Sequence, residues 1–434
     1  MCEGIPARVD HITMARDRNE ISRGPMVYDG GASHDEGGEP WMDGQGAGMS
    51  SALDGGMGPW AMGSLLGAFV TLFLVVAFDV RLFRSGRNEG RGPLREAISM
   101  RLSTGPSVVA VGGGTGLSTL LRGMKAFTRN ITAVVAVTDE GGSSGRLRTE
   151  WGVLPPGDVR NCMVALAEDD SDLRRLLDFR FDRGELAGHS LGNLLLLAAS
   201  EIHGDFRVAV ERMDRLLAIR GRVLPITTED IVLFGTTRSG LRVRGELEIS
   251  RHGHELQEIW VEPPDARPVP DALAAAAEAD AIVLGPGSLF TSVIPCLLLD
   301  PFARALRESS APKIYVCNLM TQPEETEGMD IVEHLQWTAA ALGAMPDRII
   351  VNDAPIPDDI VEAYARDGAA PLSLDDRQRE ELRAMGCACV EAPTALVMGG
   401  RGDGPRVLRH DPRALASAIL KILRHASEPG AQSA

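Results

Sequence analysis

Aromatic residues are scarce in this sequence and a net positive charge is absent, and each shortage excludes a class of protein. Aromatic side chains make up 4% of the 434 residues, whereas 48 residues are glycine. This balance favours an α/β protein with many tight turns over an all-β sandwich. The formal net charge is −16, which argues against a protein that binds nucleic acid through its phosphates, so no nucleic-acid partner is expected.

The sequence also lacks any C-x-x-C pair among its six cysteines. The spacing of Cys387 and Cys389 is too short for the usual zinc knuckle. Buried free thiols in a reducing compartment are therefore the simpler interpretation.

The N-terminal segment 1–54 has no sustained hydrophobic periodicity and is rich in Gly, Asp, Glu, Ser and Met, which predicts a disordered tail. Residues 84–104 are predicted to form a basic linker and residues 426–434 a flexible tail. Between the linker and the C-terminal tail lies the domain 105–425, which is long enough to bury a substantial core.

Residues 55–83 are expected to form a single transmembrane helix. No charged residue occurs from Gly55 to Phe78, and about 20 apolar residues suffice to cross a membrane. Arginines follow this segment directly, beginning with Arg81, which predicts a cytoplasmic domain tethered to the inner face of the cell membrane. The alternatives are a buried core helix or a signal-like segment.

Short apolar runs alternate with amphipathic stretches throughout the large domain. Such alternation predicts a doubly wound, mostly parallel Rossmann-like sheet. The expected strands are Val108–Val111, 131–137, 281–284, 313–317 and 348–351.

A glycine-rich loop follows the first of these strands and precedes a helix expected over 117–127. Glycine lets the backbone approach a ligand closely, and the unpaired N–H groups of the following helix attract phosphate. No Gly-Lys-Ser/Thr sequence follows, so the loop is not a Walker A motif, and it departs from G-x-G-x-x-G, which weakens a dinucleotide site. The alternative is a tight turn without a ligand. The loop consists of Gly112, Gly113, Gly114, Thr115 and Gly116.

A second polar loop follows the next strand, at the edge of the sheet where such folds bind ligands. Its carboxylate Asp139 could accept ribose hydroxyls, hold a metal ion or act as a base, and Arg146 could reach a phosphate. The alternative is an ordinary turn-rich loop. The other candidate residues here are Thr138, Gly142, Ser143 and Ser144.

Four further segments carry polar or glycine residues next to strands or helices. Asp158 is expected to cap a helix that starts near Val159, or to contact the ligand. His189 could carry a proton or contact phosphate, although a lone histidine is often structural. A helix starting near Phe290 offers a second anion-binding N-terminus. The remaining candidates in these segments are Asn161, Asn193, Gly285, Gly287, Ser288, Asn318 and Thr321.

Together these motifs closely resemble the YvcK family, whose members are called gluconeogenesis factors or UDP-sugar-binding proteins and are relatives of the CofD phosphotransferase. The resemblance extends over residues 107–425. It rests on GGGTGLS from Gly112, DEGGSSGR from Asp139, PPGDVRN from Pro155, GHSLGN from Gly188, GPGSLFTS from Gly285 and NLMTQP from Asn318.

The resemblance implies a CofD-like fold and a non-catalytic regulator that binds a UDP-sugar, UDP-N-acetylglucosamine first. It further implies that Tyr364 stacks on the base or sugar and that Arg409 binds the pyrophosphate. From the sequence alone, the alternatives are that Tyr364 is an ordinary surface residue and that Arg409 caps a helix. The implied role is cell-wall precursor balance and cell shape during gluconeogenic growth, with a regulated precursor enzyme as partner and self-association as a further expectation.

Two enzymatic activities, a transferase and a dehydrogenase, are the alternatives to a non-catalytic regulator. A CofD-like transferase would move a nucleotide-activated phospho-group to a hydroxy acid, with Mg²⁺ held by Asp139 and Asp158. A dehydrogenase is disfavoured by the missing third glycine. The sequence departs from the family pattern at Glu140, where a second aspartate is usual, at Phe290, where tyrosine is usual, and over 323–327.

Overall fold

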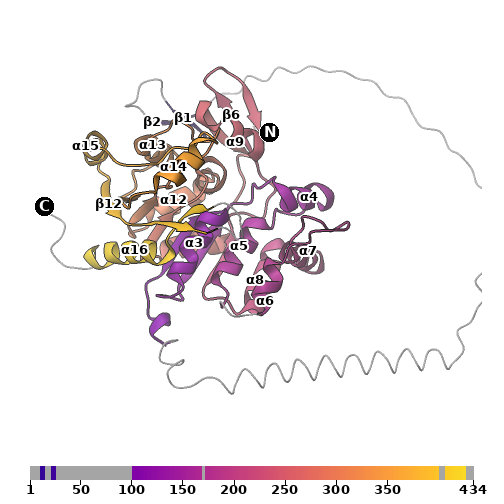
Figure 1. Cartoon of the computed structure of the whole chain (residues 1–434). Helices are drawn as coiled ribbons and strands as arrows, with labels where there is room; N and C mark the ends of the chain where they lie inside the picture. Colours follow the sequence, from indigo (N-terminus) through magenta and orange to yellow (C-terminus); the bar gives the residue numbers. More distant parts are fainter. Residues whose placement is uncertain (1–9, 15–20, 26–99, 169–171, 400–405, 427–434) are drawn as a thin grey trace, which may run out of the picture. The chain divides into compact units, whose positions relative to one another are not determined.

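The structure is a computed structural model that describes residues 10–14, 21–25, 100–168, 172–399 and 406–426 (Figure 1). The chain divides into two units, of which Met1–Met26 together with Leu102–Ala434 forms one. The expected transmembrane segment 55–83, most of the tail 1–54, and the tail beyond 426 lie outside the described residues. Within the described ranges no single helix is both long and apolar enough to cross a membrane. The helical segments Leu289–Leu297 and Asp300–Glu308 are long and apolar enough only when taken together, and the chain bends by 76° between them.

Seven parallel strands form the central sheet, which confirms the prediction of a parallel Rossmann-like architecture. Their order is β12-β11-β10-β9-β3-β4-β5, and the six pairings between neighbouring strands are all parallel. The strand β3 is fully buried, as a short apolar run between two helical layers should be. The strands are β3 Val108–Gly112, β4 Ile131–Val135, β5 Arg222–Pro225, β9 Ala281–Leu284, β10 Lys313–Val316, β11 Arg348–Asn352 and β12 Ala388–Ala392.

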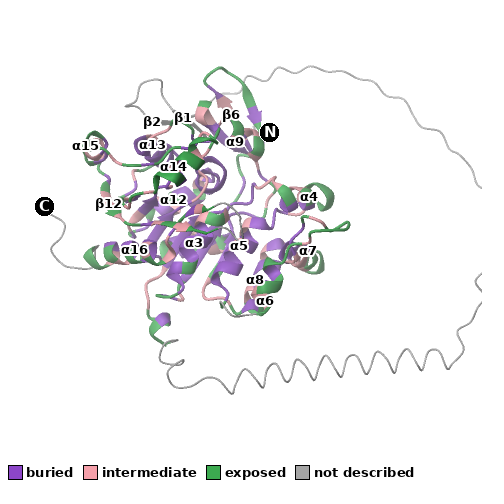
Figure 2. Ribbon diagram, in the orientation of Figure 1, coloured by how far each residue is buried: buried purple, intermediate pink, exposed green. Residues whose placement is uncertain are grey.

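Helices cover this sheet in two groups, and both groups contact β3 or β4. The first contains α3 (Gly114–Met124), α5 (Gly157–Leu166) and α16 (Pro412–Ala426), in which α3 packs on both of the others. The second contains α10 Pro270–Ala277, α11 Ile294–Leu297, α12 Asp300–Glu308 and α13 Ile331–Leu342. Figure 2 shows buried residues concentrated at the centre and exposed ones on the outer faces of the helices.

The remaining helices extend the layers on either side. They are α4 Gly142–Trp151, α6 Asp172–Asp178, α7 Leu191–His203, α8 Phe206–Leu217, α9 Glu246–His252, α14 Asp358–Ala365 and α15 Asp376–Ala384. In Figure 1, α4, α6, α7 and α8 lie at the right of the view, whereas α15 lies at the left.

A second, antiparallel sheet was not anticipated from the sequence. Its order is β2-β1-β8-β6-β7, with β8 (Leu256–Glu262), β6 (Val232–Thr237) and β7 (Arg242–Arg244) supplied by the large domain. The two other strands, β1 (Asp10–Met14) and β2 (Ile21–Pro25), lie within the segment 1–54 for which disorder was expected. Because β1 pairs with β8, a distant part of the chain supplies the order that local periodicity could not reveal.

The strand order reverses between β3 and β9, which are neighbours in the central sheet. In open parallel sheets, ligands bind beyond the carboxyl ends of the strands at such a reversal. The glycine-rich loop follows β3, and the segment beginning at Gly285 follows β9. The fold therefore brings these two predicted loops to one place.

Candidate functional site

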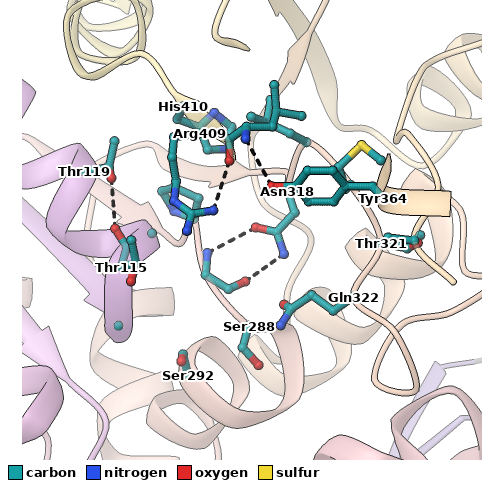
Figure 3. Close-up of a pocket in the computed structure, with 18 of the residues that line it drawn as sticks. Thr115, Thr119, Ser288, Ser292, Asn318, Thr321, Gln322, Tyr364, Arg409 and His410 are labelled. Atoms are coloured by element: carbon teal, nitrogen blue, oxygen red, sulfur yellow. Dashed lines mark hydrogen bonds between the residues drawn. The ribbon is translucent and has the colours of Figure 1, made fainter. Parts of the chain in front are cut away.

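A cavity of about 500 Å³ lies at this reversal of strand order (Figure 3). It is lined by the glycine-rich loop, by the segments after β9 and β10, and by parts of α14 and of β14 (Val407–His410), which pairs with β13 (Ala395–Met398). The predicted residues that line it are Gly113, Gly114, Thr115, Gly116, Gly287, Ser288, Asn318, Thr321, Tyr364 and Arg409.

The glycine-rich loop presents the start of α3 to this cavity. The helix begins at Gly114, three residues earlier than predicted; its N-cap residue Gly113 has no side chain to cap it, but the Gly114 N–H donates to the Asp158 carboxylate. Gly114 has φ +63°, a left-handed value that suits glycine. A Cβ on Gly116 would lie 2.7 Å from the carbonyl carbon of Pro286, so the two loops approach too closely for any side chain. Thr115 and Gly116, in the first turn of α3, line the cavity, so the N-terminal end of this helix with its partial positive charge borders the cavity.

Arg409 and Tyr364 face this helix end from β14 and α14. Figure 3 shows the Arg409 guanidinium group pointing into the cavity between Thr115 and Asn318. Its Nη1 donates to the carbonyl oxygen of Leu408 at 3.0 Å, and the side chain is exposed. The Tyr364 hydroxyl accepts the Leu408 N–H at 3.1 Å, so Tyr364 fixes the strand that carries Arg409.

Asn318 holds the opposite loop in place. Its Oδ1 accepts the Gly287 N–H at 3.2 Å and its Nδ2 donates to the Gly287 carbonyl oxygen at 2.9 Å. Both ends of the amide are thus used within the protein. Asn318 therefore contributes to the site by holding the Gly287 peptide in position.

The second predicted anion-binding helix is present, but its end is already occupied. It is a five-residue π-helix, Leu289–Val293, capped by Ser288. The Phe290 N–H donates to the Glu325 carboxylate at 3.0 Å, and the Thr291 N–H also donates to it. The N–H groups at this end are therefore directed at a buried carboxyl group of the same chain rather than at the cavity.

A second group of predicted residues does not line the cavity. The π-helix joins the two groups, because the Thr138 hydroxyl donates to the Thr291 carbonyl oxygen at 3.2 Å. This second group contains Gly112, Thr138, Asp139, Gly142, Ser143, Ser144, Arg146, Asp158, Asn161, His189, Asn193 and Gly285.

Asp158 lies directly against the glycine-rich loop. It is in the first turn of α5, whose N-cap is Pro156, so it does not cap this helix as predicted. Its carboxylate accepts hydrogen bonds from the Gly114 N–H and the Asn161 side chain. Burial, followed by the nearby Asp139 charge, raises the pKa of Asp158 from 3.8 to about 7.

Further carboxylates surround this position. Glu246, in the first turn of α9, accepts the Glu140 N–H at 2.8 Å, and burial raises the pKa of Glu246 to about 8. Asp139 accepts the Gly141 N–H at 2.8 Å. In the part of the chain that the structure describes, no group of three or more His, Cys, Asp or Glu side chains is placed to hold a metal ion.

A chain of hydrogen bonds connects Asn193, Ser143 and His189. Asn193 Nδ2 donates to Ser143 Oγ at 3.1 Å, and Ser143 Oγ lies 2.9 Å from His189 Nδ1. Burial, followed by the nearby Arg146 charge, lowers the pKa of His189, which favours the neutral ring. Arg146 itself donates to the Ala187 carbonyl oxygen at 2.9 Å rather than facing the cavity.

Several residues in or near the site were missed in the sequence. Glu246 could not be placed because the antiparallel sheet region was not assigned. Glu325 stands in the segment 323–327, whose departure from the family pattern was the available signal. The additional polar residues that line the cavity are Thr119, Ser292, Gln322, Asp367 and His410.

A parallel sheet with a glycine-rich loop, a following helix N-terminus and a cavity at its switch point defines a Rossmann-like α/β protein. The family model described as 2-phospho-L-lactate transferase CofD matches residues 108–395. The chain belongs to the CofD family, which confirms the resemblance seen in its motifs.

Curated relatives and solved structures agree with this assignment. The chain is 43% identical over 317 residues to the gluconeogenesis factor of Halalkalibacterium halodurans, which covers 73% of this chain and 96% of that protein. It is 40% identical over 321 residues to the gluconeogenesis factor of Bacillus subtilis, covering 74% and 98%. A crystal structure of a UPF0052 family protein from Bacillus halodurans matches with a TM-score of 0.68 at 42% identity, covering 73% of this chain and 99% of that one.

Proposed function

We propose that this chain is a regulatory protein that binds a UDP-sugar, UDP-N-acetylglucosamine first, in the cavity between α3 and β14. The observation that carries the proposal is the convergence of the α3 N-terminus and Arg409 on one cavity of about 500 Å³. A helix N-terminus and a guanidinium group both favour phosphate oxygens, and arginine can bind them bidentately.

The rest of the cavity suits the uncharged parts of such a ligand. The ring of Tyr364 lines it and can stack on a base or sugar, because the hydroxyl is fixed by Leu408 and the ring is held in one position. Cavities of this size are typical for small-molecule sites. Gln322 and Thr321 add polar groups for hydroxyl or amide recognition.

The biological role proposed is that of a gluconeogenesis factor, as the relatives in Halalkalibacterium halodurans and Bacillus subtilis are called. Binding of a cell-wall precursor would let the protein adjust precursor supply and cell shape during gluconeogenic growth, through a regulated precursor enzyme or through self-association. Residues 55–83 would tether the domain to the inner face of the membrane. Recovery of the full chain in the soluble fraction of broken cells would contradict the tether, and release only after deletion of 55–83 would support it.

A thermal-shift panel on the full chain tests ligand binding. UDP-N-acetylglucosamine, UDP-glucose, NAD and GDP are compared at equal concentration. A ligand at 100 times its dissociation constant stabilises the folded state by about 2.7 kcal/mol, so a UDP-sugar should raise the melting temperature while NAD should not. A shift with NAD alone would overturn the proposal.

Arg409 provides the matched variant for this panel. Replacement of Arg409 by Ala removes a charge-assisted contact, which should weaken UDP-sugar binding by about 2 kcal/mol, or roughly 30-fold. Arg413→Ala is the control, since Arg413 is exposed and does not line the cavity. Equal affinities for the two variants would place the diphosphate elsewhere.

A CofD-like transferase remains the second candidate, and Asp158 is the observation that favours it. A carboxyl with a pKa near 7 beside a phosphate-binding loop is suited to general-base catalysis on an acceptor hydroxyl. Asp139 and Asp158 offer the oxygen ligands that Mg²⁺ prefers, so they are the residues that would hold such an ion beside bound phosphate. Product formation from a nucleotide-activated donor and a hydroxy acid, lost in Asp158→Asn, would favour the transferase; tight UDP-sugar binding without turnover would favour the regulator.

A further inference from the structure

A buried histidine in the wall of the cavity makes no hydrogen bond through its ring. His410 follows Arg409 in β14 and is 8% exposed, and its ring belongs to the lining of the cavity (Figure 3). Neither ring nitrogen has a hydrogen-bond partner of normal geometry in the described part of the chain. Because buried polar groups in proteins are nearly always hydrogen-bonded, such a ring in a cavity wall points to a role in binding a ligand.

The backbone holds His410 at this position. The residue pairs with Ala395 across the two strands β13 and β14. The N–H of the next residue, Asp411, donates to the Thr394 carbonyl oxygen at 2.6 Å. Two residues earlier, the Leu408 N–H donates to the Tyr364 hydroxyl. The ring is therefore fixed in the cavity wall and is not free to turn towards solvent.

The ring is neutral and its two nitrogens have different roles. Burial lowers the pKa of His410 to about 4, and a neutral imidazole has one nitrogen that donates and one that accepts. The Cys317 backbone acts in the opposite direction and favours a proton on the ring. Since the Cys317 N–H already donates to the Ile350 carbonyl oxygen at 3.0 Å, the Cys317 carbonyl oxygen is the group that attracts the ring N–H, although it falls short of a hydrogen bond. The other nitrogen of His410 is then the acceptor.

A phosphate group does not match this acceptor, because the oxygens of an ionised diphosphate accept hydrogen bonds and donate none. The preceding residue supplies what a phosphate needs, since the Arg409 guanidinium group points into the cavity and carries charged donors. Two successive residues of β14 thus offer different chemistry, a charged donor at Arg409 and a neutral acceptor at His410.

We propose that His410 is a ligand-binding residue whose accepting ring nitrogen takes a hydrogen bond from the uncharged part of the ligand, namely a sugar or ribose hydroxyl or an N–H of the base or of an amide. This inference rests on the proposed nucleotide-sugar site and deepens it. It divides recognition along one strand, with the diphosphate bound by Arg409 and the base or sugar by His410.

The substitution His410→Leu tests this role, because it replaces the ring by apolar atoms of similar volume. Calorimetric titration of the full chain should show UDP-N-acetylglucosamine binding weakened about tenfold, the effect of losing one hydrogen bond to a buried partner. The urea midpoint of the ligand-free protein should be unchanged or higher, because no hydrogen bond within the chain is lost and an unpaired buried polar group is removed. A histidine that only supports the fold would give the reverse result, a lower midpoint with unchanged affinity.

His334→Leu is the matched control. His334 lies in α13, is fully buried and also has one ring nitrogen without a partner, but it does not line the cavity. Its Nδ1 lies 2.7 Å from the Asp330 carbonyl oxygen. This variant should bind UDP-N-acetylglucosamine as the wild type does.

The outcomes separate the two claims. If the wild type does not bind UDP-N-acetylglucosamine, the proposed function fails and this inference falls with it. If the wild type binds and His410→Leu binds as tightly as His334→Leu, the inference alone is overturned.

A structure of the wild-type chain with UDP-N-acetylglucosamine decides the matter if His410→Leu does not fold or is less stable than the wild type. A ligand hydroxyl or N–H within about 3.2 Å of a ring nitrogen of His410 would support the inference. A phosphate oxygen at that distance, or water alone, would overturn it.

Discussion

At the scale of the residue, Asp158 shows how position alters the chemistry of one carboxyl group. Its side chain packs so closely on the glycine-rich loop that a Cβ on Gly113 would overlap it. The Gly114 N–H stabilises the charged form, but burial and the Asp139 charge act more strongly and raise the pKa of Asp158 to about 7. The site therefore contains a carboxyl group that changes charge near physiological pH.

This shift predicts that stability falls as pH rises. The folded protein holds the Asp158 proton more tightly than the unfolded chain, whose pKa is 3.8, so the stabilising contribution is complete below pH 3.8 and is lost as pH approaches about 7. Asp158→Asn should reduce the loss of unfolding free energy by up to about 1.4 kcal/mol per pH unit over this range. Urea denaturation of the full chain at pH 5, 6 and 7 measures it.

Asp214 provides the control variant, because it is a buried carboxyl group with a raised pKa that lies away from the cavity. Burial raises the pKa of Asp214 to about 8, and its carboxylate accepts the Val223 N–H at 3.0 Å, away from the cavity. Asp214→Asn should flatten the pH dependence of stability in the same direction without altering how UDP-sugar affinity varies with pH. If Asp158→Asn leaves the pH dependence of unfolding unchanged, the assigned pKa is wrong.

Part of the site could be predicted at this scale, and part could not. The glycine-rich loop, Ser288 and Arg409 were found because glycine runs and motif positions are visible along the chain. The role of Asn318 in holding Gly287, and the occupation of the π-helix by Glu325, depend on contacts between residues more than 30 positions apart. No local pattern encodes such pairings.

At the scale of the element, the close approach of α3 to the loop after β9 determines the shape of the cavity. This approach requires a residue without a side chain at Gly116, where a Cβ would lie 2.9 Å from the Gly287 Cα and nearer still to Pro286. Both neighbours are backbone atoms, which cannot rotate away.

Gly116→Ala should therefore destabilise the fold and open the cavity. We expect a loss of about 1–3 kcal/mol in unfolding free energy, which is typical of overpacking, together with weaker UDP-sugar binding. Gly399→Ala is the control, because nothing lies within 4 Å of a Cβ at that position. Equal denaturation midpoints for the two variants would show that the loops separate without cost.

The elements differ in how well the sequence predicted them. Five of the seven parallel strands were predicted because each is a short apolar run that is buried along most of its length. The strands β5 and β12, at the two edges of the sheet, were missed; β12 has no buried residue. The strands β1 and β2 were missed because their order comes from pairing with β8 rather than from their own composition. The start of α5 was misplaced by two residues because Gly157 and Asp158 are both in its first turn.

At the scale of the whole molecule, the site consists of two adjacent regions with opposite electrostatic character. The cavity presents a helix N-terminus and Arg409, whereas the region behind the glycine-rich loop gathers Asp139, Asp158 and Glu246. The first suits a diphosphate, and the second suits hydroxyl groups or a cation. This division follows from the reversal of strand order between β3 and β9, which brings loops from distant parts of the chain together.

The most direct test of this account is a crystal structure of the protein with UDP-N-acetylglucosamine bound. We predict that oxygens of the pyrophosphate lie within about 3.2 Å of backbone N–H groups at Thr115 or Gly116 and of the Arg409 guanidinium nitrogens. A pyrophosphate bound away from both α3 and Arg409, for example among the carboxylates around Asp158, would contradict it.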